Sequence, residues 1–182
     1  MKKWNTLTLI TAFVVLLGSC SKKVKELPDA TQNGSNTFGA KVDGTLWAPK
    51  GFGIVPTAAL LEARSNPNRD LFINARNFAS SPVETELEIY VKHVVEPGVY
   101  PLSFATAKYP SETASYAYYV KRNITPLNEW MTNTHYTGSV TITKADTVNN
   151  IFAGTFQFNA INLYNTPQAI SVTEGRFDIK IP

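Results

Sequence analysis

The sequence predicts an all-β protein, built as a single antiparallel β-sandwich or barrel-like domain of about nine or ten short strands. Three observations lead to this prediction. Apolar and polar residues alternate with a period of two, which is the period of a half-buried strand. Turn residues such as Gly, Pro, Asn and Asp separate these alternating segments at short intervals. The last third of the chain repeats this arrangement three times, in residues 138–143, 151–161 and 169–181.

The first pair of strands is expected around the dipeptide Asp43-Gly44. A two-residue type I′ turn needs positive φ at both central positions, and Asp-Gly is a preferred pair there. This register pairs Val42 with Thr45 and Ala40 with Trp47. It also turns the apolar residues of the hairpin to one face, which we expect to enter the core.

Strand candidates in the middle of the chain follow the same pattern. Residues 83–91 are the clearest, because their apolar residues fall on one face and the glutamates at 84, 86 and 88 fall on the other. We therefore expect a solvated sheet surface at these glutamates. Pro97-Gly98 predicts a type II turn before residues 99–104. The other candidates are residues 71–78 and the aromatic segment 115–122.

The final strand changes phase along its length. Its apolar residues fall on even positions up to Val172 and on odd positions from Phe177 onward. One extra residue must be accommodated between them, so a β-bulge or sharp bend is predicted near Glu174-Gly175. Gly175 is the residue expected to permit it.

Two segments do not fit the alternation. Residues 58–64 (AALLEAR) have high helix propensity but are too short for periodicity to decide, and we expect a strand there. Thr125-Pro126 is suited to the N-cap and first turn of a helix and is followed by LNEWM. A short helix or an ordered loop is expected at that place.

The N-terminus reads as a lipoprotein signal peptide over residues 1–19. Two lysines precede an apolar run at 7–17, which as a helix is about 16 Å long and too short to span a ~30 Å hydrocarbon core. The string Leu17-Gly18-Ser19-Cys20 resembles the lipobox of bacterial lipoproteins. Cys20, the only cysteine of the chain, is therefore the predicted lipidation site and membrane anchor.

Residues 20–36 are expected to form a lipidated cysteine and a disordered tether, ahead of a β-rich globular domain at 37–182. The tether has no aromatic residue and is rich in Lys, Ser, Asn and Gln. In many Bacteroidota lipoproteins, acidic residues directly after the cysteine direct export to the cell surface. Lys22, Lys23 and Lys25 stand there instead, which favours the outer membrane with the domain facing the periplasm, with surface exposure as the alternative.

Charge and cysteine content exclude some partners. Removal of Lys2 and Lys3 with the signal peptide lowers the 17 basic residues to 15, against 14 acidic ones, so no nucleic-acid partner is indicated. With Cys20 lipidated, no disulfide is available. No spacing of His, Cys, Asp or Glu indicates a metal, and no motif indicates a cofactor.

Catalytic candidates are few. His93 and His135 are the only histidines, and neither lies in a pattern typical of nucleophilic catalysis, so no catalytic residue is assigned. The glutamates at 84, 86 and 88 have a spacing compatible with a pair of glycosidase carboxylates. Their alternation with apolar residues favours a solvated sheet surface instead.

The nearest approach to a recognition surface is the tyrosine-rich segment. Tyr116 and Tyr118 share one strand face, and Tyr119 takes the other. Exposed rings there would contact an envelope glycan or a partner protein, whereas buried rings would fill the core. Asp146-Thr147-Val148 is similar to a Bacteroidota O-glycosylation acceptor, which makes Thr147 a candidate glycosylation site. Asn123-Ile124-Thr125 fits the N-glycosylation pattern of eukaryotic secretion.

Several strings carry a resemblance to a known group: TFGAKVDGTLWAP, EPGVYPL, GSVTITKAD, GTFQFNA and VTEGRFDI. They are similar to small Bacteroidota lipoproteins with an uncharacterised all-β envelope domain, over most of residues 37–182. The shared residues are turn glycines and core aromatics. The resemblance implies a family and a compartment, but no activity, ligand or catalytic residue.

These observations favour a non-enzymatic, membrane-anchored envelope lipoprotein that binds a partner or ligand through an exposed β-face or through the loops at one end. Two alternatives remain. An envelope hydrolase acting on glycan or peptide would need convergent carboxylates, or His135 beside a hydroxyl and a carboxylate. A structural or assembly subunit would present long exposed edge strands.

Overall fold

The computed structural model describes residues 25–51, 59–79, 83–122, 128–164 and 167–182. The predicted signal peptide, Cys20, the Asn123 acceptor pattern and the Thr125-Pro126 helix start lie outside these residues. Eleven strands are described, and this part of the chain has no helix long and apolar enough to span a membrane. In chain order the strands are β1 (Thr37–Val42), β2 (Thr45–Trp47), β3 (Leu61–Ser65), β4 (Leu71–Asn77), β5 (Glu84–Val91), β6 (Gly98–Pro101), β7 (Tyr116–Arg122), β8 (Glu129–Met131), β9 (Gly138–Asp146), β10 (Ile151–Asn162) and β11 (Ala169–Lys180).

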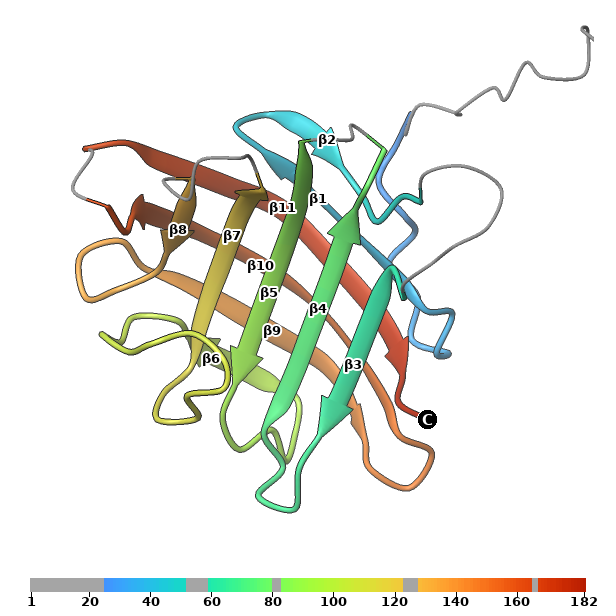
Figure 1. Cartoon of the computed structure of the whole chain (residues 1–182). Coiled ribbons are helices and arrows are strands. Elements are labelled where there is room, and N and C mark those ends of the chain that lie inside the picture. Colours follow the sequence, from blue (N-terminus) through green and yellow to red (C-terminus); the bar gives the residue numbers. More distant parts are fainter. Residues whose placement is uncertain (1–24, 52–58, 80–82, 123–127, 165–166) are drawn as a thin grey trace, which may run out of the picture.

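All eleven strands belong to one antiparallel sheet that curls into a half-barrel (Figure 1), which confirms the all-β prediction. The main path runs β2-β1-β11-β10-β8-β7-β5-β4-β3. The long strand β10 is the branch point, because its first part pairs with β9 and its last two residues pair with β8. Strand β6 extends the β9 branch.

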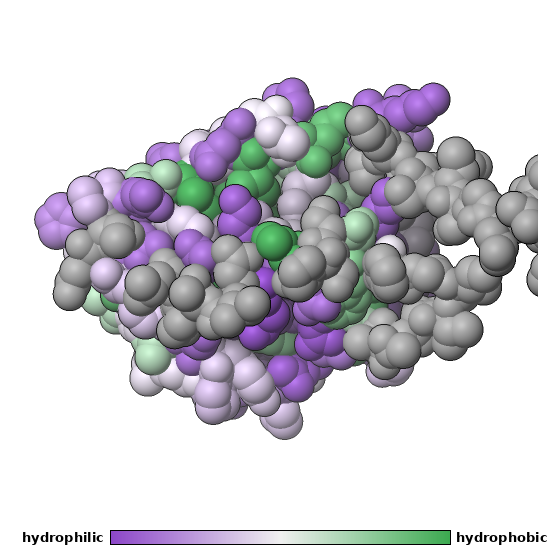
Figure 2. All heavy atoms as spheres, turned by 45° about the horizontal axis from the view of Figure 1, so that its top comes forward, coloured by the Kyte–Doolittle hydropathy of each residue, from purple (hydrophilic) through white to green (hydrophobic). Residues whose placement is uncertain are grey.

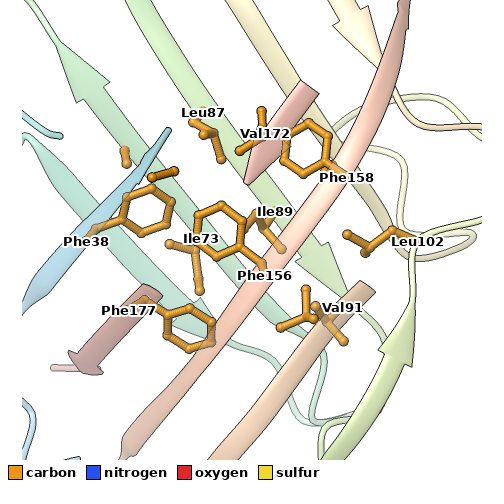
Figure 3. Packing of buried hydrophobic residues seen from close by; sticks show 14 of the residues in the cluster. Phe38, Ile73, Leu87, Ile89, Val91, Leu102, Phe156, Phe158, Val172 and Phe177 are labelled. Atoms are coloured by element: carbon orange, nitrogen blue, oxygen red, sulfur yellow. The ribbon is translucent and has the colours of Figure 1, made fainter. Parts of the chain in front are cut away.

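The main core lies inside the curve of the sheet. Phe156 of β10 is at its centre, and Figure 3 shows Ile73 of β4, Ile89 of β5 and Phe38 of β1 around its ring. Residues from opposite branches of the sheet therefore pack against one another. Burial of this apolar surface, at about 25 cal/mol per Å², is the main source of stability in a chain with one cysteine and no disulfide.

The predicted hairpin is confirmed. Val42 pairs with Thr45 and Ala40 with Trp47, and both turn residues have positive φ, 47° at Asp43 and 76° at Gly44. The tip of the hairpin is bound to β11, since the Asp43 amide donates to the Ser171 carbonyl and the Ser171 amide donates to Asp43 Oδ1.

The predicted bulge in the final strand is present, but the role of Gly175 differs from the one expected. Pairing with β10 passes from Phe156 opposite Gly175 to Phe158 opposite Val172, so β11 carries the extra residue there. Glu174 takes the positive φ of 53°, whereas Gly175 does not. Gly175 is required because the ring of Phe156 occupies the space where a Cβ would stand.

Three other expectations are wrong. Residues 129–131 form strand β8 where a short helix or loop was expected. Gly98 begins β6 without the positive φ that a type II turn needs. The disorder expected of the tether is also wrong for residues 25–36, because they pack on the sheet and donate hydrogen bonds to buried Asp178.

The two edges of the curled sheet approach each other at one end. After β2, the Lys50 amide donates to the Arg76 carbonyl, and the Lys50 carbonyl accepts from the Phe78 amide. These bonds lie just past Ala75, the residue of β4 that pairs with the first residue of β3. Asn77 Nδ2 donates to the Ala48 carbonyl at 2.8 Å, and Trp47 Nε1 donates to Thr85 Oγ1 of β5 at 2.8 Å. These bonds hold the β1–β2 hairpin against the opposite branch and define the mouth of the half-barrel.

Candidate functional site

A pocket of about 530 Å³ opens at this mouth, within the size range of small-molecule sites. Its floor is the upper end of the main core, formed by the rings of Trp47, Tyr119 and Trp130. We call it the mouth pocket and define it by these rings together with Asp43, Leu46, Lys121, Gln168 and Ile170. Figure 2, which brings this end of the molecule forward, shows hydrophobic residues among polar ones.

The aromatic floor is built from three separate strands. Trp47 ends β2, Tyr119 lies in the middle of β7, and Trp130 lies in the middle of β8. Tyr119 pairs directly with Trp130 across the two strands, with ring centroids 5.9 Å apart. Burial raises the pKa of Tyr119, and the nearby Asp43 carboxylate raises it further, against a hydrogen bond with Thr85 that lowers it. The hydroxyl therefore stays neutral at physiological pH.

The rim of the mouth pocket carries one charge of each sign. Asp43 is placed there by the hairpin turn and Lys121 by the core-facing side of β7, two residues beyond Tyr119. Neither takes part in an ion pair with another described residue. Asp43 Oδ1 accepts from the Ser171 amide at 2.9 Å, and both charged side chains line the pocket. Trp130 adds a buried indole N–H that has no acceptor among the described residues.

Sequence reasoning did not find this pocket. Its residues come from positions 42–47, 119–130 and 168–170, which are brought together only by the curvature of the sheet. Trp47 was recognised as a core residue of the hairpin, but nothing in the sequence relates it to Trp130. No local pattern could have identified the site.

The candidate contact residues Tyr116 and Tyr118 lie elsewhere, on the outer face of the sheet. They share a face as predicted, but their exposed fractions are 0% and 3%, so they form no exposed aromatic patch. Both belong to a second cluster that we call the outer-face cluster. It consists of Phe72, Tyr90, Tyr116, Tyr118, Val120 and Met131. Tyr119, on the opposite face, is also buried.

Two of the three β5 glutamates, Glu86 and Glu88, are not on a solvated surface, which corrects the expectation, whereas Glu84 is half-buried. Glu86 and Glu88 are 8% and 7% exposed and share the Asn74 Nδ2 donor. Arg122 Nε donates to Glu86 at 3.1 Å, and the Tyr116 hydroxyl donates to Glu88. Burial raises the pKa of Glu88, an effect larger than that of the hydrogen bonds that lower it.

These carboxylates lie beneath the segment between β6 and β7. The Tyr109 amide of that segment donates to the Tyr116 hydroxyl, and the Arg64 guanidinium lies 4.4 Å from the Tyr109 ring centroid. Lys108 Nζ bonds the Tyr118 hydroxyl at 2.9 Å and Glu129 at 2.7 Å. Because protein groups occupy the carboxylate oxygens, the arrangement fastens a loop to the sheet and offers no facing pair of carboxylates to a glycan.

The remaining candidates lie in three different connections between strands. His93 follows β5, where its ring contacts the Asn68 carbonyl, and His135 lies between β8 and β9, where its ring contacts Thr134. Both are exposed. Thr147 is exposed in the β9–β10 turn, which Asp146 stabilises by accepting from the Val148 and Asn149 amides. The described residues contain no group of three metal-ligating side chains.

Comparison with known proteins gives one match. No curated protein and no solved structure matches the chain. A family model described as a domain of unknown function, DUF6252, matches residues 35–182. This stretch contains all eleven described strands. The chain therefore belongs to the DUF6252 family.

Proposed function

We propose that this chain is a lipid-anchored protein of the bacterial cell envelope whose β domain binds a small amphipathic ligand in the mouth pocket and catalyses no reaction. The mouth pocket carries the proposal. It combines an aromatic floor with two charges of opposite sign, Asp43 and Lys121, neither of which forms an ion pair with another described residue. Apolar pockets with a few polar groups at the edge are the usual form of small-molecule sites.

The chemistry of the walls supports an amphipathic ligand. Leu46, Ile170 and the three rings offer an apolar surface to the body of a ligand, and Lys121 offers an ammonium to an acidic group.

The binding experiment uses the tryptophans of the protein. Of the three in the chain, Trp4 lies in the predicted signal peptide, so the processed protein has only Trp47 and Trp130, both in the pocket. We expect the anionic aromatic probe 1-anilinonaphthalene-8-sulfonate to quench their fluorescence saturably. Lys121→Glu should weaken binding roughly tenfold, about 1.4 kcal/mol.

Lys180→Glu is the matched control, because it makes the same charge change at an exposed residue outside the pocket. Binding by Lys180→Glu should equal that of the parent protein. If Lys121→Glu and Lys180→Glu bind the probe equally well, the mouth pocket is not the site and the proposal fails.

Anchoring is tested at Cys20. The predicted lipobox supports acylation there, so a metabolically incorporated alkynyl fatty acid should label the parent protein and not Cys20→Ala. Labelling of Cys20→Ala would contradict the lipoprotein proposal. We further propose that the domain faces the periplasm at the outer membrane, since lysines follow Cys20. External protease should then leave the domain intact in whole cells, and its digestion would place the protein on the surface.

A further inference from the structure

Residues 25–36, which we call the strap, are fixed to the outer face of β11. Asp178 is fully buried beneath them and accepts four hydrogen bonds from the strap. The donors are Thr31 Oγ1 at 2.6 Å and the amides of Asn33, Gly34 and Ser35 at 3.1, 2.7 and 3.2 Å. A buried carboxylate surrounded by donors in this way makes the strap part of the folded domain.

The strap is held along its length. Lys144 Nζ donates to the Gln32 carbonyl at 3.0 Å, and Arg176 donates to the Pro28 carbonyl at 3.2 Å. Pro28 lies directly on Gly39 of β1, where a Cβ would stand 2.6 Å from Pro28 Cδ. Glu26 and Leu27 then border a groove beside Ala48, the residue that follows β2.

The direction of the strap is therefore defined. Gly34 lies against Lys180 at the last residue of β11, Pro28 lies at Arg176, and Glu26 lies beside the end of β2. Figure 1 shows the first described residues at the end of the half-barrel that carries β2. The mouth pocket includes Ala169 at the start of β11, so it also lies toward this end.

The remaining link to the anchor is short. Only residues 21–24 separate Cys20 from Lys25. Five chain steps of at most about 3.6 Å reach roughly 18 Å. Strand β11 has 12 residues and spans about 40 Å. The link is therefore shorter than half of the domain, and it cannot let the domain rotate freely over a bilayer.

We infer that the strap holds the domain with its mouth pocket toward the lipid surface and the β9–β10 turn away from it. This inference rests on the proposed lipidation of Cys20. The partner of the pocket end is the bilayer itself. The ligand class follows from this placement, because an amphiphile in the lipid interface reaches the pocket without crossing the aqueous compartment.

Two positions on the domain report its orientation. Thr45 is exposed at the rim of the mouth pocket, and Val148 is 90% exposed in the β9–β10 turn, which adjoins the opposite end of β11. Acylated Thr45→Cys and Val148→Cys each have one free thiol, because the Cys20 sulfur carries the lipid. Both are labelled with the same dye and bound to phosphatidylethanolamine–phosphatidylglycerol vesicles that contain a rhodamine-labelled lipid acceptor.

Energy transfer from position 45 should exceed that from position 148. A long Gly/Ser linker inserted after Lys22 should abolish the difference, because a flexible chain no longer orients the domain. Asp178→Asn, which weakens the strap, should reduce it. Equal transfer from both positions at the native linker length, or greater transfer from position 148, would overturn the inference.

Vesicle flotation separates this inference from the proposed anchor. If the labelled proteins fail to float with the vesicles, the proposed lipidation of Cys20 is wrong, and the orientation inference, which rests on it, is wrong as well. If they float and the two positions transfer energy equally, the anchor stands and only the orientation is wrong.

Discussion

Phe156 lies directly over Gly175, so closely that a Cβ at position 175 would stand 2.4 Å from two carbons of the ring. Phe156 is at the centre of the main core and cannot move aside without displacing its neighbours. The residue before the glycine, Glu174, has a φ of 53° and bears the conformational strain of the bulge.

This arrangement predicts opposite effects at adjacent positions. Gly175→Ala should lower the free energy of unfolding by roughly 1–3 kcal/mol, because the added methyl overpacks the core. Glu174→Gly should be nearly neutral or stabilising, because glycine adopts the left-handed conformation without strain. Urea denaturation midpoints of the two variants provide the measurement. Strong destabilisation by Glu174→Gly with a silent Gly175→Ala would reverse the assignment.

The bulge shows how far local sequence rules reach. The change of phase in β11 located the extra residue, and the Asp43-Gly44 turn fixed the register of the first hairpin. Both depend on residues close in sequence. The curl of the sheet depends on pairing between strands far apart along the chain, such as β1 with β11, and no local pattern encodes it. The mouth pocket is a product of that curvature, which is why only the structure reveals it.

The predictions made for the glutamates of β5 and for the strap were wrong for a related reason. Alternation placed Glu86 and Glu88 correctly on the face opposite the main core, but it could not show that the segment before β7 covers them. The strap has too little apolar surface to order itself. It is ordered by polar contacts with Asp178, and composition carries no signal for such a partner.

We predict that strand β7 does not tolerate truncation of its tyrosine side chains on either face. Tyr116 is fully buried in the outer-face cluster, and Tyr119 is buried in the main core. Tyr116→Ala and Tyr119→Ala should each lower the free energy of unfolding by about 3–5 kcal/mol, since each leaves a cavity. Tyr109→Ala, at a ring that is 39% exposed, is the comparison and should cost less. Near-native unfolding midpoints for Tyr116→Ala would mean that its face is open to solvent.

Glu88 predicts a pH dependence of stability. Burial raises its pKa in the folded state, and the Glu86 charge adds to this, so the unfolded chain loses the proton first, near pH 4.3. Stability contributed at this site therefore falls as pH rises from that value through the folded-state pKa. Glu88→Gln removes the titration. In urea titrations, the free energy of unfolding of Glu88→Gln relative to that of the parent protein should be larger at pH 8 than at pH 4.

The control for this prediction is Glu96→Gln at an exposed position. Its effect on stability should be small. A Glu88→Gln effect that is independent of pH would show that Glu88 is not held in a desolvated site.

Asp178 predicts the opposite dependence, at the strap. Burial raises its pKa, but the hydrogen bonds from Thr31 and the strap amides together outweigh burial, so the folded-state pKa lies below the ordinary value. The stability contributed by Asp178 is complete above the unfolded pKa of about 3.9 and is lost as pH falls through the folded-state pKa. Asp178→Asn should cost roughly 3 kcal/mol at pH 7, because it leaves donors unpaired around a buried group.

Hydrogen exchange at the strap amides distinguishes a role of Asp178 in holding the strap from a general loss of packing. In native-state hydrogen exchange, Asp178→Asn should release protection at Gly34 and Ser35 while the central strands stay protected, because local opening needs less free energy than global unfolding. Asp29→Asn, on an exposed residue of the same strap, should leave that protection unchanged. The destabilisation by Asp178→Asn should also shrink as the pH falls below the unfolded-state pKa of about 3.9, because the unfolded parent chain then takes up the proton before the folded protein does. If it is as large at pH 3 as at pH 7, the hydrogen-bonded carboxylate is not what holds the strap.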